Sequence, residues 1–197
     1  MSKTPISKKS TQKTELFYKI MKSPVGMLKL VGSEKGLAAI LWEKENPRRI
    51  RLGEVGTIVG EDKKLPIFLE TEKQLGEYFA GKRKSFDFKN LKLDFHGTDF
   101  QKKVWKALLN IPFGQTVSYG DIAKKVGTPK ASRAVGSANN KNPISIIAAC
   151  HRVVSSSGKL AGYAGGMKAK VHLLELEGKK IKNTMSSKNP DKNSRLV

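Results

Sequence analysis

The period of the hydrophobic pattern changes near residue 97, and this change divides the chain into two units of different class. In the first half, apolar segments at 16–22, 27–31 and 37–44 are short and are separated by Gly and Pro residues. Such spacing is typical of a three-stranded antiparallel meander. In the second half, apolar residues recur every three or four positions, which indicates amphipathic helices.

A helix and one more strand complete the first unit in this interpretation. Apolar side chains between residues 67 and 79 recur at near-helical spacing, and the pattern ends at Gly81. Residues 86–93 could return to the sheet as a strand. We therefore expect an α/β N-terminal domain over residues 14–92, made of a small antiparallel sheet with a helix.

The second unit carries three helix-start signals. Thr98-x-x-Gln101 is a capping-box pattern, and Ser118-x-x-Asp121 starts a second, short helix. Thr128-Pro129 places a proline at the start of a third helix, predicted over 130–139. Two short helices across the turn at Gly127 make a helix-turn-helix candidate, although an ordinary helical hairpin is the commoner alternative. We expect a mainly α-helical C-terminal domain that contains a helix-turn-helix.

The remaining segments are a linker and two tails. Residues 93–97 link the first unit to the second, which extends over 98–178. Residues 1–13 and 179–197 are polar and basic with few large apolar side chains, so both are predicted to be flexible tails.

The charge is strongly positive and is concentrated in the second half. The chain has 38 basic and 17 acidic residues, a formal net charge of +21. Residues 97–178 alone hold 12 basic residues against 4 acidic ones. An excess of this kind favours an anionic partner, most often nucleic acid. A solvated, lysine-rich surface is the alternative.

The cysteine content and the lengths of the apolar runs indicate where in the cell the protein is located. The single cysteine excludes an intramolecular disulfide framework and a multi-cysteine zinc site. No apolar run is long enough to span a bilayer, and residues 1–13 lack the apolar core of a secretion signal. We expect no membrane partner and an intracellular location, in the cytoplasm or, in a eukaryote, the nucleus.

The tripeptide Cys150-His151-Arg152 is the best candidate for chemistry. A lone cysteine after the apolar run 144–149 is more often a small buried hydrophobe than a nucleophile. Here, however, an imidazole that can act as a base and a guanidinium that favours thiolate follow directly. The base would need an acidic partner, and spacing does not choose among the acids of this half, which are Asp99, Asp121, Glu175 and Glu177.

Several ordered motifs identify a family. The second half contains GTDFQKKVWKALLNIPFGQTVSYGDIA, RAVGSANNKNP, CHRVV, GKLAGYAGG and LLELEG, and the first contains SPVGMLKL and YFAGKR. Together they resemble the O6-alkylguanine-DNA alkyltransferases, also called methylated-DNA–protein-cysteine methyltransferases. The resemblance covers nearly everything between the tails. It implies a DNA repair protein that flips O6-alkylguanine, mainly O6-methylguanine, out of double-stranded DNA and takes the alkyl group irreversibly onto its own cysteine in a single turnover.

The resemblance also implies roles for individual residues. Cys150 would be the acceptor, and His151, acting through a water and oriented by Glu177, would be the base. Tyr119 would help rotate the target nucleotide, and Asn142 would brace the active-site turn. Arg133 would fill the vacated space in the base stack. The other residues implied are Lys130, Ala131 and Ser132 on a helix in the minor groove, and Val153, Tyr163 and Ala164 in the alkyl pocket.

One position departs from the family pattern, which has proline directly before the cysteine where this chain has Ala149. That substitution bears on the rigidity of the turn rather than on the nucleophile. We expect no cofactor, no metal and a monomer. Two rival classes remain open on the residues alone, a DNA-binding module with an inert cysteine and a multiple-turnover cysteine hydrolase.

Overall fold

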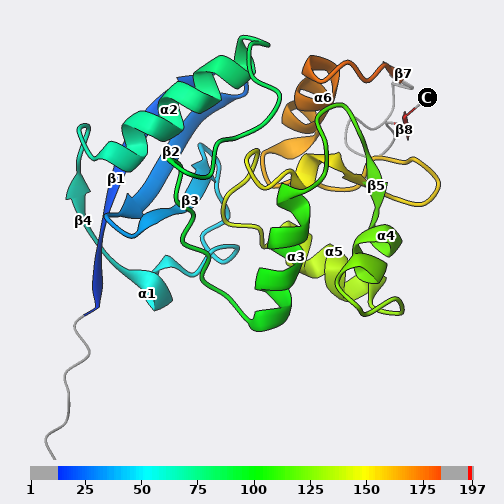
Figure 1. The fold of residues 1–197 in the computed structure, drawn as a ribbon, viewed down its shortest axis with the longest axis horizontal. Coiled ribbons are helices and arrows are strands. Elements are labelled where there is room, and N and C mark those ends of the chain that lie inside the picture. The colour runs from blue at the N-terminus through cyan, green and yellow to red at the C-terminus, as the bar shows by residue number, and fades with distance from the viewer. Residues whose placement is uncertain (1–12, 183–194, 197) are drawn as a thin grey trace, which may run out of the picture.

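The structure, a computed structural model, describes residues 13–182 and 195–196 (Figure 1). The predicted N-terminal tail falls almost wholly outside these residues. In the segment predicted as the C-terminal tail, β7 (Ile181–Lys182) pairs antiparallel with β8 (Arg195–Leu196).

The N-terminal half is a four-stranded sheet in the order β3-β2-β1-β4. The meander is confirmed, because β1 (Thr14–Ser23), β2 (Gly26–Ser33) and β3 (Gly36–Trp42) pair antiparallel in sequence order. A fourth strand that we did not predict, β4 (Gly56–Glu61), pairs parallel with β1 after the short helix α1 (Leu52–Val55). The sheet is therefore mixed rather than purely antiparallel.

The predicted helix is confirmed, whereas the predicted strand at 86–93 is wrong. Helix α2 (Pro66–Phe79) runs along one face of the sheet (Figure 1). In the segment after it, the Asp87 carboxylate accepts from the Lys89 N–H, and the Leu91 N–H donates to the Asp87 carbonyl. These contacts turn the backbone away from an extended path. The segment regains β pairing only at one bridge, between Leu37 and Leu93.

The C-terminal half is helical, as the sequence predicts. Helices α3 (Asp99–Leu109) and α4 (Tyr119–Lys125) both begin with a complete capping box. Helix α5 (Ser132–Asn140) begins two residues later than predicted. Pro129 lies instead in a turn that the Ala131 N–H closes on the Thr128 carbonyl at 2.9 Å.

The last elements shape the region around the cysteine. A 3-10 turn, η1 (Cys150–Arg152), leads into β6 (Val153–Val154), which pairs parallel with β5 (Val117–Ser118). Helix α6 (Gly166–Leu176) follows. The chain turns away from the helix at Gly178, whose φ of +83° is a left-handed conformation that glycine adopts without strain. None of the helices within the described residues combines the length and the apolarity needed to cross a bilayer.

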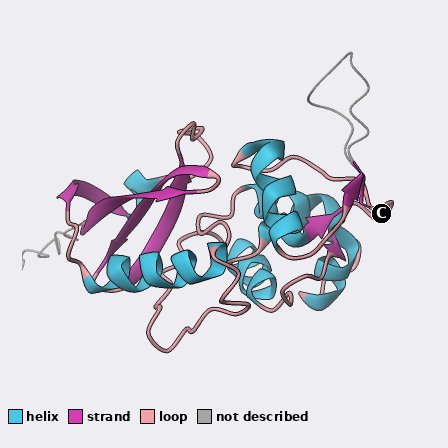
Figure 2. Cartoon of the chain, turned by 90° about the horizontal axis from the view of Figure 1, so that it is seen from above, coloured by secondary structure: helices cyan, strands magenta, loops and turns pink. Residues whose placement is uncertain are grey.

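The two halves share one hydrophobic core. A single cluster of buried side chains joins Leu28, Ile40 and Phe68 of the first half to Ile144 and Leu173 of the second. The Ile40 N–H also donates to the Pro143 carbonyl at 2.8 Å, and an isolated parallel bridge pairs Ile40 of β3 with Ile144, in the segment that precedes the cysteine. Seen from above, the sheet and α2 lie on one side of this junction and the helices lie on the other (Figure 2).

Candidate active site

Cys150 sits at the start of η1 in a constrained turn. Its side chain is buried, with 2% of the residue exposed. Four residues earlier, Ile146 has a φ of +75°, which is strained for a β-branched residue. Asn142 braces this turn, because its side-chain amide donates to the Ala148 carbonyl at 2.7 Å and its oxygen accepts from the Ile144 N–H at 3.1 Å. Such stored strain is typical of functional sites.

The residue before the cysteine keeps a conformation that proline adopts. Ala149 has a φ of −72°, within the range that a pyrrolidine ring allows. Within the described residues its N–H has no hydrogen-bond acceptor. The substitution of alanine at this position therefore leaves the path of the turn intact.

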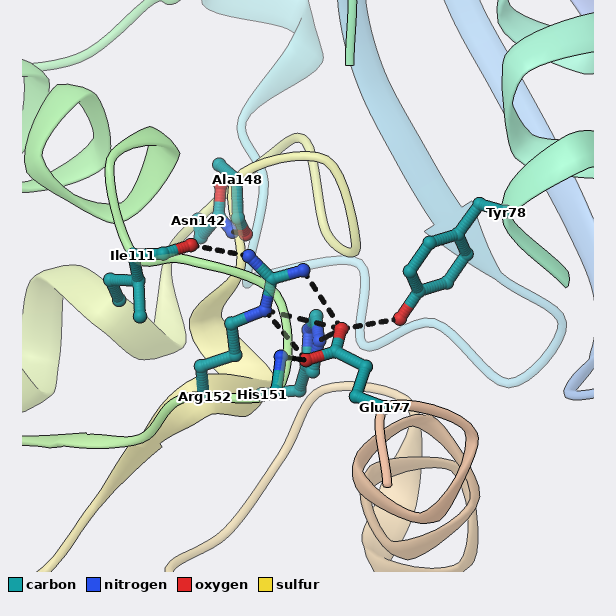
Figure 3. A network of polar contacts seen from close by, with 8 residues as sticks. Tyr78, Ile111, Asn142, Ala148, His151, Arg152 and Glu177 are labelled. Carbon is teal, nitrogen blue, oxygen red and sulfur yellow. Dashed lines mark hydrogen bonds and ion pairs between the residues drawn. The ribbon is translucent and has the colours of Figure 1, made fainter. Parts of the chain in front are cut away.

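The carboxylate of Glu177 organises the polar groups beside the cysteine (Figure 3). Its Oε1 accepts from His151 Nε2 at 2.8 Å and from Arg152 Nη2 at 2.8 Å. Tyr78 Oη donates to the same oxygen at 2.7 Å. The Gly114 N–H donates to Oε2 at 3.1 Å. Among the four acids that the sequence left open, the structure thus brings Glu177 to the histidine.

The protonation states in this cluster follow from burial and hydrogen bonding. Burial alone would raise the pKa of Glu177, but hydrogen bonds and charge from His151 and Arg152 outweigh it and lower that pKa to about 2. Burial, together with the charges of Arg152 and Lys170, lowers the pKa of His151 although the hydrogen bond and charge of Glu177 oppose this. At neutral pH the carboxylate is ionised and can only accept, so His151 carries its proton on Nε2. Nδ1 is then the basic nitrogen, and it is buried with no protein partner among the described residues.

Two tyrosines lie close to the cysteine. Burial raises the pKa of Tyr119, and the charge that Cys150 would carry as a thiolate adds to the rise. The Tyr119 ring lies over Gly136 of α5, where a β-carbon would contact it at 3.8 Å. The Tyr163 ring stands edge-on to Trp42 and to His151, with centroids 5.5 Å and 6.4 Å apart. Its hydroxyl is buried, and burial raises its pKa well above the usual value.

The other predicted site residues fall into two groups. Val153, three residues after Cys150, is fully buried, and Ala164 is half-buried. Lys130, just before α5, and Arg133, in its first turn, are exposed, and Ala131 and Ser132 are half-buried between them. The structure therefore separates a buried reactive centre from an exposed basic helix, and Tyr119 lies between the two.

Sequence reasoning missed two buried polar side chains, Lys170 and Tyr78. Lys170 is fully buried on α6, donates to the Val153 carbonyl at 2.8 Å, and has a pKa that burial lowers to about 8. Tyr78 comes from the other half of the chain and was not considered. Arg152, whose positive charge we expected to favour the thiolate, binds the Glu177 carboxylate and the Ile111 carbonyl. The position of Lys170 on the apolar stripe of α6 was the available signal for a buried cation.

Two family models together match most of the chain. The ribonuclease-like domain of 6-O-methylguanine DNA methyltransferase matches residues 16–95, and the DNA-binding domain of the same family matches residues 99–179. A methylated-DNA–protein-cysteine methyltransferase of Methanosarcina acetivorans is 48% identical over 163 residues, which are 83% of this chain and 99% of the relative. The corresponding protein of Mycobacterium tuberculosis is 46% identical, over 82% of this chain and 92% of its own length.

Solved structures agree with these sequence matches. The crystal structure of the Mycobacterium tuberculosis O6-methylguanine methyltransferase is similar at a TM-score of 0.70 and 45% identity, covering 82% of this chain and 92% of that one. The Mycobacterium tuberculosis OGT in complex with DNA is similar at a TM-score of 0.68 and 42% identity, covering 83% and 92%. The family resemblance is confirmed, and so is the predicted fold class of an α/β N-terminal domain followed by a mainly α-helical C-terminal domain. The chain belongs to the 6-O-methylguanine DNA methyltransferase family.

Proposed function

We propose that the protein repairs O6-alkylguanine in DNA, mainly O6-methylguanine, by moving the alkyl group onto Sγ of Cys150. The observation that carries this proposal is the arrangement of three buried groups, the Cys150 thiol, the His151 imidazole and the Glu177 carboxylate. The only cysteine of the chain is followed by a histidine whose Nε2 is held by an ionised carboxylate and whose Nδ1 is free to take a proton. The full-length curated relatives named above support the same activity.

The first step is removal of the thiol proton. A free thiol has a pKa near 8.5 and is only a few per cent ionised at neutral pH, so it needs a base. His151 Nδ1 takes this proton, through a water, and Glu177 stabilises the imidazolium that forms. The buried cation of Lys170 adds a positive charge close to the thiolate, since Cys150 raises the pKa of Lys170.

The second step is the transfer itself. Sγ attacks the methyl carbon, the S–C bond forms, and the bond from carbon to O6 breaks with its electron pair on guanine. Guanine leaves more readily when it receives a proton, and we assign this donation to the Tyr119 hydroxyl. Tyr119 then regains a proton from the imidazolium or from solvent. The thioether has no easy return path, so each molecule acts once.

The DNA face is the α4–α5 pair, used as a helix-turn-helix. DNA is the partner, as it is for the solved relative described as a complex with DNA. We place α5 in the minor groove, where the small side chains of Ala131, Ser132 and Gly136 permit a close approach. Extruding a base costs a few kcal/mol, and insertion of Arg133 into the stack offsets part of that cost. We further propose that the protein acts as a monomer in a reducing compartment, the cytoplasm or a nucleus, because Cys150 must remain a free thiol.

The test of this function is a stoichiometric one. The protein is incubated with an excess of duplex carrying one O6-methylguanine, and the Cys150 peptide is then examined by mass spectrometry. We expect one methyl group per protein, on Cys150, and one repaired base per protein. Sustained turnover would favour a hydrolase-type reaction, and binding without labelling would favour a DNA-binding module; either result would contradict the proposal.

Replacement of the exposed arginine should separate flipping from chemistry. An Arg133→Ala protein should repair duplex DNA more slowly by about tenfold, because no side chain replaces the lost stacking, but should repair single strands at close to the normal rate. Single-turnover rates on both substrates measure this difference. The exposed Lys124→Ala change on α4 is the matched control, since it removes one positive charge without removing the intercalating side chain. An equal loss on duplex and single strand would argue against the role of Arg133 in the stack.

A further inference from the structure

Tyr78 reaches the Glu177 carboxylate from the opposite half of the molecule. It lies in the last turn of α2, 99 residues before Glu177, and its side chain is fully buried. In Figure 3 its hydroxyl points at the carboxylate from the side opposite to Arg152 and His151. The roles proposed above for catalysis and DNA binding use no residue of the N-terminal sheet domain, so this contact is unexplained by them.

The contact is made to the oxygen that also holds the histidine. Glu177 Oε1 accepts from Tyr78 Oη at 2.7 Å and from His151 Nε2 at 2.8 Å. Oε2 accepts from the Gly114 N–H and from Arg152 Nε, at 3.1 and 2.8 Å. Rotation of the carboxylate would break at least one of these bonds. The Tyr78 hydroxyl therefore helps to fix the direction in which Oε1 meets the imidazole.

The tyrosine is itself held in place. Its ring packs against three aromatic rings, those of Phe79, Phe86 and Phe113, with centroid distances of 5.5, 5.7 and 6.2 Å. Burial, together with the charge of Glu177, raises the pKa of Tyr78 far above its usual value. The hydroxyl thus stays protonated near neutral pH, and it donates its proton to the Glu177 carboxylate, which can only accept.

We propose that Tyr78 is a positioning residue for alkyl transfer, whose hydroxyl holds Glu177 so that His151 keeps Nδ1 available for the Cys150 proton. The inference rests on the proposed function of Cys150 and His151. It makes the sheet domain a working part of the reactive centre, in addition to its share of the common core. Transfer of this kind depends on geometry, and small displacements of a base are costly.

Loss of the hydroxyl should also change the basicity of the histidine. Besides Tyr78, the titratable or charged groups that face the Glu177–His151 pair are Arg152, Lys170, Tyr163 and Cys150. The Tyr78→Phe substitution removes only the Tyr78 oxygen and leaves these four groups in the protein. The carboxylate then shares less of its negative charge with a donor and stabilises the imidazolium more strongly, so the pKa of His151 rises. The acid limb of the rate–pH profile should move to higher pH.

The test is Tyr78→Phe, which keeps the aromatic packing and removes one oxygen. At saturating O6-methylguanine duplex, the single-turnover rate should fall by about tenfold. The DNA concentration that gives half of the maximal rate should not change, because α5 is untouched. The matched control is Thr71→Val on the same helix, which removes a buried hydroxyl bonded to the Ile67 carbonyl rather than to Glu177. This control should lose stability without a change in rate or in the pH profile.

A second background shows whether Tyr78 acts through Glu177. In a Glu177→Gln protein, the further change Tyr78→Phe should have no additional effect on the rate. If the loss in that background equals the loss in the wild type, or if Thr71→Val slows transfer as much, the proposal is wrong. An unchanged rate and acid limb in Tyr78→Phe alone would overturn it as well, whether or not the double variant folds. Failure of the wild type to methylate Cys150 would instead count against the proposed function.

Discussion

A Cys150→Ala protein should transfer no methyl group from O6-methylguanine, while its affinity for DNA stays close to that of the wild type. The chain holds no second thiol, and nearby hydroxyls such as Ser155 are too weakly acidic to replace a thiolate. Affinity should survive because the Cys150 side chain is buried and the exposed basic residues of the α4–α5 pair are unchanged. Mass spectrometry of the protein and a gel-shift titration against unmodified duplex measure the two properties.

The salt dependence of binding supplies a control for this variant. Contacts from Lys and Arg to phosphates release counterions, so the affinity of both proteins should fall steeply, and in parallel, as salt is added. If Cys150→Ala lost affinity at all salt concentrations, the cysteine would have to be treated as structural. If it retained repair, the alkyl acceptor would be another residue.

The second large effect concerns Glu177 and acid. The pKa of this carboxyl is about 2 in the folded protein, against the usual value of 4.5 that we take for the unfolded chain. Because the folded pKa is the lower one, the contribution to stability is fully present above about pH 4.5 and is lost as the pH falls towards 2. The difference corresponds to about 3 kcal/mol as an order of magnitude. Wild-type stability should therefore decline on acidification across this window.

A Glu177→Gln protein gives the matched comparison. At pH 7 it should be destabilised by about 3–5 kcal/mol, because Arg152 stays buried without its counter-charge. It should also transfer methyl groups slower by about a hundredfold or more, since His151 loses the charge that stabilises the imidazolium. Denaturant unfolding at pH 7 and at pH 3 measures both stabilities. We expect the gap between the two proteins to narrow at pH 3, and a constant gap would show that the carboxyl titrates normally.

The local elements were predictable where short-range signals decide them. Two capping boxes, at Thr98 and Ser118, start helices where the sequence places them, and the three apolar runs of the first half form the expected meander. The wrong or missing strand predictions fall where contacts between distant segments decide the local structure. Strand β4 has exposed apolar residues such as Val59 and owes its place to pairing with β1. Segment 86–93 turns at Asp87 because side-chain contacts compete with the ladder.

The site was predictable in part for the same reason. Cys150 and His151 are adjacent, so a thiol beside a base is visible in the sequence. The roles that the family motifs imply for Tyr119, Arg133 and Asn142 remain predictions. Spacing could not choose Glu177 among four acids, because 26 residues of chain separate it from His151. The contact of Tyr78 with Glu177 could not be predicted for the same reason, since 99 residues of chain separate them and only the packing of the two halves brings them together. Contacts between distant segments depend on the whole fold.

The position of Glu177 after the last turn of α6 also sets the order in which the site is completed during synthesis. Ribosomes release a chain from its N-terminus, so the sheet domain, helices α4 and α5, and Cys150 itself all emerge before the Glu177 carboxylate. Until then His151 lacks its anchor, Tyr78 lacks its acceptor, and Arg152 lacks its counter-charge. A chain that ended between Cys150 and Glu177 would carry the thiol without the carboxylate that orients its base. The thiol can therefore be activated only after the rest of the site and the sheet domain have been synthesised.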